Sequence, residues 1–120
     1  MVKMKLKPLL PSLREKKRYL AFELISKGRI SDCNVVSKAI MDSSLQLLGL
    51  LGAAKAGIMV LNNKWNSTMQ RGIIKVTHKY VDALKAALML TNKIDEKEVI
   101  LRSLGVSGIL NKSEKFLAKG

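Results

Sequence analysis

The spacing of apolar residues switches repeatedly between the two-residue period of a strand and the 3.6-residue period of a helix. Leu20, Phe22 and Leu24 fall on one face of an extended segment, whereas Val36 and Ile40 recur at helical spacing. Applied along the chain, the two periods predict strands over residues 19–25, 54–65, 69–77 and 98–103, and helices over residues 31–48, 79–91 and 111–119.

This order predicts an α+β fold, a ferredoxin-like or RNA-recognition-motif-like βαββαβ sandwich. A four-stranded antiparallel sheet would carry two covering helices, and a C-terminal helix would follow. Ser31 is the expected N-cap of the first helix, and Gly49 with Gly52 is expected to end it. We expect a loop over residues 92–97 and a turn over residues 105–108.

The first 18 residues differ in character from the rest. They hold seven Lys or Arg side chains against one acid, and Pro8 and Pro11 prevent an unbroken helix or strand. We therefore predict a basic N-terminal arm over residues 1–18 and a single domain over residues 19–120.

The charge of the whole chain points to a polyanionic partner. Lys and Arg number 22 and Asp and Glu number 9, which gives a net charge of +13 and a pI near 10.1. Nucleic acid fits this excess better than a membrane, because no run approaches the ~18 apolar residues of a span. The single cysteine, Cys33, forms no internal disulfide, which fits the cytoplasm.

The residues that carry enzyme chemistry are scarce. The chain has one histidine, His78, and one cysteine, too few for a nucleophile–base pair or a zinc site. Its glycines form no phosphate-binding loop. We expect no catalytic residue, no metal ligand and no cofactor in the protein itself.

Base stacking is also disfavoured, because aromatic residues are only 4% of the chain and the strand over residues 69–77 has none. Binding should therefore go to RNA phosphates. The candidates are Lys3, Lys5, Lys7, Arg14, Lys16, Lys17 and Arg18 in the arm, and Arg71, Lys75, Lys112, Lys115 and Lys119 on the sheet and tail.

The first helix has more apolar residues than one buried face requires. Its core stripe is predicted to be Cys33, Val36, Ile40, Ser43 and Leu47, which leaves Met41, Leu45 and Leu48 on another side. Either the terminal helix or a loop covers these three side chains, or a protein partner binds them.

Four stretches of the sequence resemble a known family. Residues 10–22 (LPSLREKKRYLAF), 86–90 (AALML), 100–108 (ILRSLGVSG) and 115–119 (KFLAK) are similar, in this order, to archaeal ribonuclease P protein component 2. The similarity spans nearly the whole chain.

The resemblance implies a protein subunit of the ribonucleoprotein that removes the 5′ leader from precursor tRNA. It implies that the RNA is the catalyst and binds the magnesium ions, and that the protein supports the catalytic half of that RNA. The implied protein partners are a TIM-barrel subunit, protein component 3, and a second copy of the chain at the centre of a heterotetramer. Precursor tRNA would be met through the holoenzyme. The alternative from charge alone is a structural ribosomal or chromatin-type protein.

Overall fold

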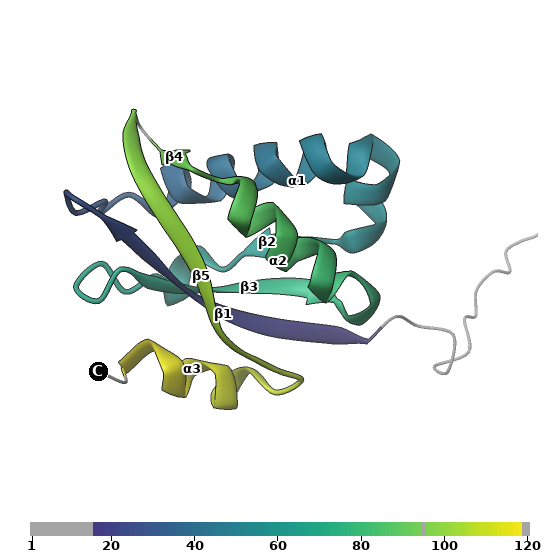
Figure 1. Ribbon diagram of the computed structural model, residues 1–120. Coiled ribbons are helices and arrows are strands. Elements are labelled where there is room, and N and C mark those ends of the chain that lie inside the picture. Colours follow the sequence, from purple (N-terminus) through teal and green to yellow (C-terminus); the bar gives the residue numbers. More distant parts are fainter. Residues whose placement is uncertain (1–15, 95, 119–120) are drawn as a thin grey trace, which may run out of the picture.

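A computed structural model describes residues 16–94 and 96–118 of the chain (Figure 1). In chain order, the elements are β1 (Lys17–Ser26), α1 (Cys33–Ala56), β2 (Met59–Val60), η3 (Asn62–Lys64), β3 (Arg71–Thr77), η4 (His78–Tyr80), α2 (Val81–Leu90), β4 (Lys93–Ile94), β5 (Lys97–Ser107) and α3 (Leu110–Ala118).

The sheet is antiparallel and has five strands, in the order β2-β3-β1-β5-β4. The predicted order of strands and helices is confirmed, but the predicted count of four strands is wrong. The additional strand, β4, lies within the expected loop over residues 92–97 and pairs Lys93 with Glu98 and Ile94 with Lys97. Two residues carry no detectable period, so this strand has no signal in the sequence.

The main core lies between the sheet and the pair of helices α1 and α2. Leu20, Phe22 and Leu24 of β1 are buried there, as predicted, against residues of both helices such as Ile40 and Leu84. The ring of Phe22 stacks on Trp65, with 6.0 Å between ring centroids.

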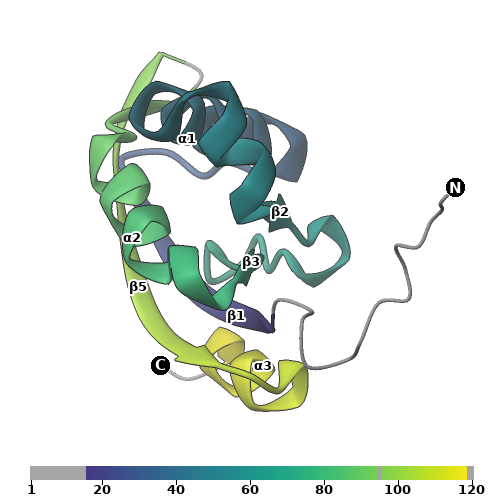
Figure 2. The same ribbon diagram turned by 90° about the vertical axis from the view of Figure 1, so that its right-hand side faces the viewer.

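The opposite face of the sheet is covered by α3, which packs on β1, β5 and β3. Figures 1 and 2 show α1 and α3 on opposite sides of the strands. Ser113 Oγ donates a hydrogen bond of 2.9 Å to the Tyr19 carbonyl, and Ala21 and Ile73 on this face are fully buried. The terminal helix α3 therefore does not pack on α1. The fold has three layers, which are α1 with α2, the sheet, and α3.

Helix α1 is longer than predicted. Gly49 leaves the helical conformation (φ 75°, ψ 173°), but the helix resumes after it and ends at Ala56, with Gly57 in the left-handed region. Gly49 therefore interrupts the helix without ending it. The N-cap is Asp32 instead of Ser31, because Asp32 Oδ1 accepts a 2.9 Å hydrogen bond from the Asn34 N–H.

Strand β5 also extends beyond its prediction, through the expected turn at residues 105–108. Gly105 pairs with Ala21 and Ser103 pairs with Phe22, so Leu104 is the extra residue of a β-bulge. Gly105 is therefore part of a strand that bends beside β1, and the chain does not reverse direction there.

Close packing around Gly72 provides a test of the core. A Cβ at this position would lie 3.0 Å from both Phe22 Cε1 and Trp65 Cε3. Gly72→Ala should therefore lower the free energy of unfolding by about 1–3 kcal/mol through overpacking. Gly28→Ala is the control, because its Cβ would meet only the flexible end of Lys97. Urea unfolding of both variants checks this, and equal stabilities would contradict such tight packing at Gly72.

Candidate nucleic-acid interface

Cations gather at the end of the sheet where the chain enters β1. We name this cluster the basic end and define it as Lys16, Lys17, Arg18, Lys55 and Lys79. Three hydrogen bonds hold its segments together: His78 N–H to the Lys16 carbonyl (2.8 Å), Lys17 Nζ to Thr77 Oγ1 (3.3 Å), and Thr77 Oγ1 to the Lys55 carbonyl (3.4 Å). The basic end thus joins residues from β1, α1 and the turn after β3.

Strand register places Lys17 within this cluster. Lys17 pairs with Thr77, and a Cβ on Gly57 would lie 3.3 Å from Lys17 Nζ. The ammonium group therefore lies near the C-terminus of α1, where the helix dipole favours a cation, and Lys55 occupies the last turn of the same helix. Lys17 helps to fix the end of α1, and its residue is exposed, as are Lys16, Lys55 and Lys79.

Arg18 connects the basic end to the start of the terminal helix. It is half-buried, its Nη1 donates a 3.0 Å hydrogen bond to the Lys17 carbonyl, and it lies against Gly108. Tyr19, the next residue, faces the opposite side of the sheet, where half-buried Lys75 pairs with it, and the Tyr19 carbonyl accepts the bond from Ser113 of α3. Lys112 and Lys115 are exposed on that helix.

Arg71 does not lie on the surface where the sequence pattern placed it. It is buried, and its Nη2 lies 3.3 Å from Glu23 Oε2. The other oxygen of Glu23 accepts from Arg102, whose side chain was not among the predicted residues, at 2.8 Å. Cross-strand register explains the network, because Glu23 pairs with Arg71 on one side and with Arg102 on the other. Arg71 is therefore an internal ion-pair partner of the sheet.

The remaining predicted RNA contacts lie outside the residues that the structure describes. They are Lys3, Lys5, Lys7, Arg14 and Lys119. Lys55 and Lys79 were not among the residues predicted from the sequence, because they are far from Lys16 and Lys17 along the chain. The end of α1 brings Lys55 near these residues, and the pairing of β1 with β3 brings Lys79 near them.

The apolar surface of α1 differs from its prediction. Met41 and Leu48 are partly buried against the main core, whereas Leu45 is exposed. Leu47, assigned to the core stripe, is 43% exposed. The most exposed leucines of α1 lie beyond Gly49, at Leu50 and Leu51, in a segment that was predicted to lie outside the helix. The helical period assumes an unbroken helix, so it could not predict the change of direction at Gly49.

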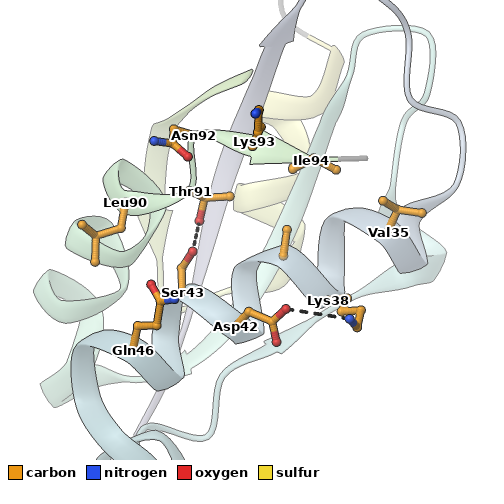
Figure 3. A pocket seen from close by; sticks show the side chains of 11 residues that line it. Val35, Lys38, Asp42, Ser43, Gln46, Leu90, Thr91, Asn92, Lys93 and Ile94 are labelled. Atoms are coloured by element: carbon orange, nitrogen blue, oxygen red, sulfur yellow. Dashed lines mark hydrogen bonds and ion pairs between the residues drawn. The ribbon is translucent and has the colours of Figure 1, made fainter. Parts of the chain in front are cut away.

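A polar recess lies between α1, α2 and β4, with a volume of about 420 Å³ (Figure 3). At its base Thr91 Oγ1 and Ser43 Oγ lie 2.7 Å apart, and Thr91 Oγ1 also donates to the Ala87 carbonyl. Lys38 and Asp42 form an exposed ion pair at its rim. The buried hydroxyl groups tie the end of α2 to α1, and the lining contains no nucleophile–base pair.

The reactive side chains are dispersed. Among residues 16–94 and 96–118, no three His, Cys, Asp or Glu side chains are placed to hold a metal ion. Burial, and then the negative charge of Asp32, raises the pKa of the Cys33 thiol to about 11, so this thiol is neutral at pH 7. No helix in the described part of the chain is long and apolar enough to cross a membrane.

Comparison with known proteins identifies one family. The Rpp14/Pop5 family matches residues 18–118. Ribonuclease P protein component 2 of Pyrococcus horikoshii is 41% identical over 116 residues, which cover 96% of this chain and 94% of that protein. The protein of the same name from Methanosarcina mazei is 42% identical over 113 residues, 93% of each chain.

A solved structure shares the fold. A chain in the cryo-EM structure of yeast ribonuclease MRP superposes with a TM-score of 0.60 and covers 87% of each chain, at 11% sequence identity. At this identity the similarity is one of fold.

The Glu23 network gives a prediction for stability. Glu23→Ala would leave the buried Arg71 without its carboxylate, and the free energy of unfolding should fall by about 3–5 kcal/mol. Asp42→Ala breaks the exposed pair with Lys38 and should change the free energy of unfolding by no more than about 0.5 kcal/mol. Denaturant unfolding of the two variants measures both values. Equal effects would show that the Glu23 network contributes no more than a surface pair.

Proposed function

Since this chain belongs to the Rpp14/Pop5 family and is a protein subunit of ribonuclease P, we propose that the basic end binds phosphates of the RNA in that ribonucleoprotein. The observation that carries the proposal is the convergence of cations from β1, α1 and the turn after β3 at one end of the sheet. Neutralised phosphates release counterions, which supplies affinity without reading the base sequence.

The charges around the basic end favour an anionic ligand. Glu23, Asp42 and Glu114 form ion pairs with cations elsewhere on the molecule. Two acids are close to the basic end, Asp82 in the first turn of α2 and Glu15 directly before Lys16 in the sequence, and its five cations outnumber them. The arm, with its four further predicted contacts, precedes Lys16 directly in the sequence. We propose that the arm extends the same RNA contact, and that Lys75, Lys112 and Lys115 extend it over α3.

The reaction itself is proposed to belong to the RNA. In this proposal the RNA binds the magnesium ions and removes the 5′ leader of precursor tRNA in the cytoplasm, while the protein supports the catalytic half of the RNA and supplies no reacting group. The family match replaces the alternative of a ribosomal or chromatin-type protein.

A second proposal concerns protein partners. We propose that protein component 3, a TIM-barrel subunit, covers the apolar surface of α1 after its break, and that two copies of the chain associate within a heterotetramer. Leu50 and Leu51 are 82% and 71% exposed and lie beside each other in sequence. Covering them stabilises a complex by roughly 1.5–3 kcal/mol for each fully buried side chain.

Salt dependence tests the RNA contact. In the triple variant Lys16→Ala, Lys55→Ala and Lys79→Ala, the slope of log K against log[salt] should become shallower by about 0.7 for each phosphate that the protein no longer neutralises. The control replaces the exposed residues Lys38, Lys85 and Lys93 with Ala, which removes the same net charge elsewhere. An equal change of slope in both triple variants would mean that only the total charge matters, and the basic end would have to be rejected as the site.

Assembly with component 3 tests the apolar surface. Leu50→Glu should leave the stability of the isolated chain nearly unchanged, because the side chain is already exposed, and should prevent complex formation in size-exclusion chromatography with light scattering. Leu48→Glu is the contrasting variant, since Leu48 packs on the core and its change should destabilise the isolated chain. A Leu50→Glu variant that still assembles normally would exclude this surface.

A further inference from the structure

A buried polar residue, Thr77, lies among the cations of the basic end. It is the last residue of β3 and is only 1% exposed. Thr77 Oγ1 accepts a 3.3 Å hydrogen bond from Lys17 Nζ and donates a 3.4 Å hydrogen bond to the Lys55 carbonyl. The single hydrogen of the hydroxyl group therefore goes to the carbonyl, while its oxygen accepts from the ammonium group. One buried hydroxyl group thus connects a cation of β1 with the last turn of α1.

Strand register brings Lys17 against Thr77. The His78 N–H donates to the Lys16 carbonyl, which makes these two residues a hydrogen-bonded pair of β3 and β1. The adjacent pair, Lys17 with Thr77, is therefore of the non-hydrogen-bonded type, whose side chains approach each other more closely. The contact between the ammonium and hydroxyl groups follows from this pairing.

The other neighbour of Thr77 is the C-terminus of α1. Met59 of β2 pairs with Lys75 of β3, and the same register continued by two residues places position 57 opposite position 77. A Cβ at Gly57 would accordingly lie 3.4 Å from Thr77 Oγ1 and 3.3 Å from Lys17 Nζ. Figure 1 shows the end of α1, the end of β3 and the start of β1 on the same side of the molecule. Lys17, Thr77 and Gly57 therefore form one row across the end of the sheet.

This row affects how the basic end meets an anion, because α1 ends in it. The C-terminus of a helix carries a partial negative charge, which by itself repels a phosphate. The Lys17 ammonium group lies beside this helix end, and the Thr77 hydroxyl group donates to one of its carbonyls. Both groups make the potential at the helix end less negative, and the hydroxyl group holds them together.

We propose that Thr77 is a positioning residue for the RNA contact. Its hydroxyl group fixes the Lys17 ammonium group and the last turn of α1 relative to each other, which preorganises the surrounding cations for phosphates. Thr77 itself is buried and makes no contact with RNA. This inference rests on the proposed function of the basic end. It assigns the arrangement of that site to an uncharged residue, which a charge pattern in the sequence does not reveal.

Binding of the full chain to ribonuclease P RNA at several salt concentrations tests the proposal. Thr77→Val removes the hydroxyl group at nearly constant side-chain shape. It should weaken RNA binding about tenfold at low salt, and the slope of log K against log[salt] should become shallower by about 0.7, the effect of one lost phosphate contact. Thr77→Ser keeps the hydroxyl group and should retain the affinity and the slope of the parent protein.

Thr91→Val is the matched control. Thr91 is also a buried threonine, 4% exposed, and its hydroxyl group also makes two hydrogen bonds, with Ser43 Oγ and the Ala87 carbonyl. It lines the polar recess, whose lining contains no residue of the basic end. Both valine variants should unfold at lower urea concentration, but Thr91→Val should keep the RNA affinity of the parent. An equal loss of affinity in both variants would overturn the proposal, because the effect would then be one of stability alone.

A measurement on the unchanged protein makes the test independent of the folding of Thr77→Val. In ¹⁵N spectra of the side-chain ammonium groups, the protons of Lys17 should exchange with water more slowly than those of exposed Lys85. Equal exchange would overturn the proposal. So would a Thr77→Val variant that binds RNA as the parent does, or a Thr77→Ser variant that is impaired as much as Thr77→Val.

The triple lysine variant of the basic end separates the two possible failures. If this variant keeps the salt slope of the parent, the basic end is not the RNA site, and the proposed function fails together with this inference. If the triple variant has a shallower slope while Thr77→Val does not, the basic end remains the RNA site and only the positioning role of Thr77 is rejected.

Discussion

Two-sided burial of β1 is the constraint on which the structure depends. Leu20, Ala21 and Phe22 are consecutive and fully buried, so the strand has no solvent-facing side at its centre. One face packs against α1 and α2, and the other needs α3 to cover it. A strand that is buried on both faces fixes its register tightly, because a slip of one residue would exchange the two faces. That register in turn places Lys17 opposite Thr77 and Glu23 between Arg71 and Arg102.

The same constraint separates the surfaces of the molecule. With the sheet enclosed by helices, its centre offers no aromatic platform for bases, and polar chemistry is confined to the ends and edges. One end of the sheet collects the cations of three segments. After the break at Gly49, the last part of α1 buries Ala53 and Ala56 and leaves Leu50 and Leu51 exposed. Leu51 and Lys55 lie one helical turn apart in this last part of α1, so the proposed RNA and protein contacts adjoin there.

Much of the fold could be predicted because its signals are local. The apolar alternation of Leu20, Phe22 and Leu24 and the helical period of Val36 and Ile40 identify elements directly. Other features depend on contacts between distant residues. Strand β4 has two residues and no period, Gly105 reads as a turn residue but sits beside a bulge, and Gly49 interrupts a helix without ending it.

The candidate site shows the same division. The density of charge near residue 16 is visible in the sequence, but the approach of Lys55 and Lys79 arises from the fold. Arg71 was predicted on the exposed face of its strand, yet the carboxylate of Glu23 and the neighbouring strands enclose it. Sequence patterns give the face of a strand, and only the packing decides whether that face meets solvent.

The central claim is that RNA lies against the basic end, and tethered cleavage tests it most directly. Cys33 is buried with its pKa raised to about 11, so a cysteine introduced by Lys55→Cys can be labelled selectively with an iron chelate. In the assembled ribonucleoprotein, hydroxyl radicals from position 55 should cut the RNA at a few discrete sites, whereas the same label at Lys38→Cys should give little cleavage. Strong cuts from position 38 and none from position 55 would contradict the account.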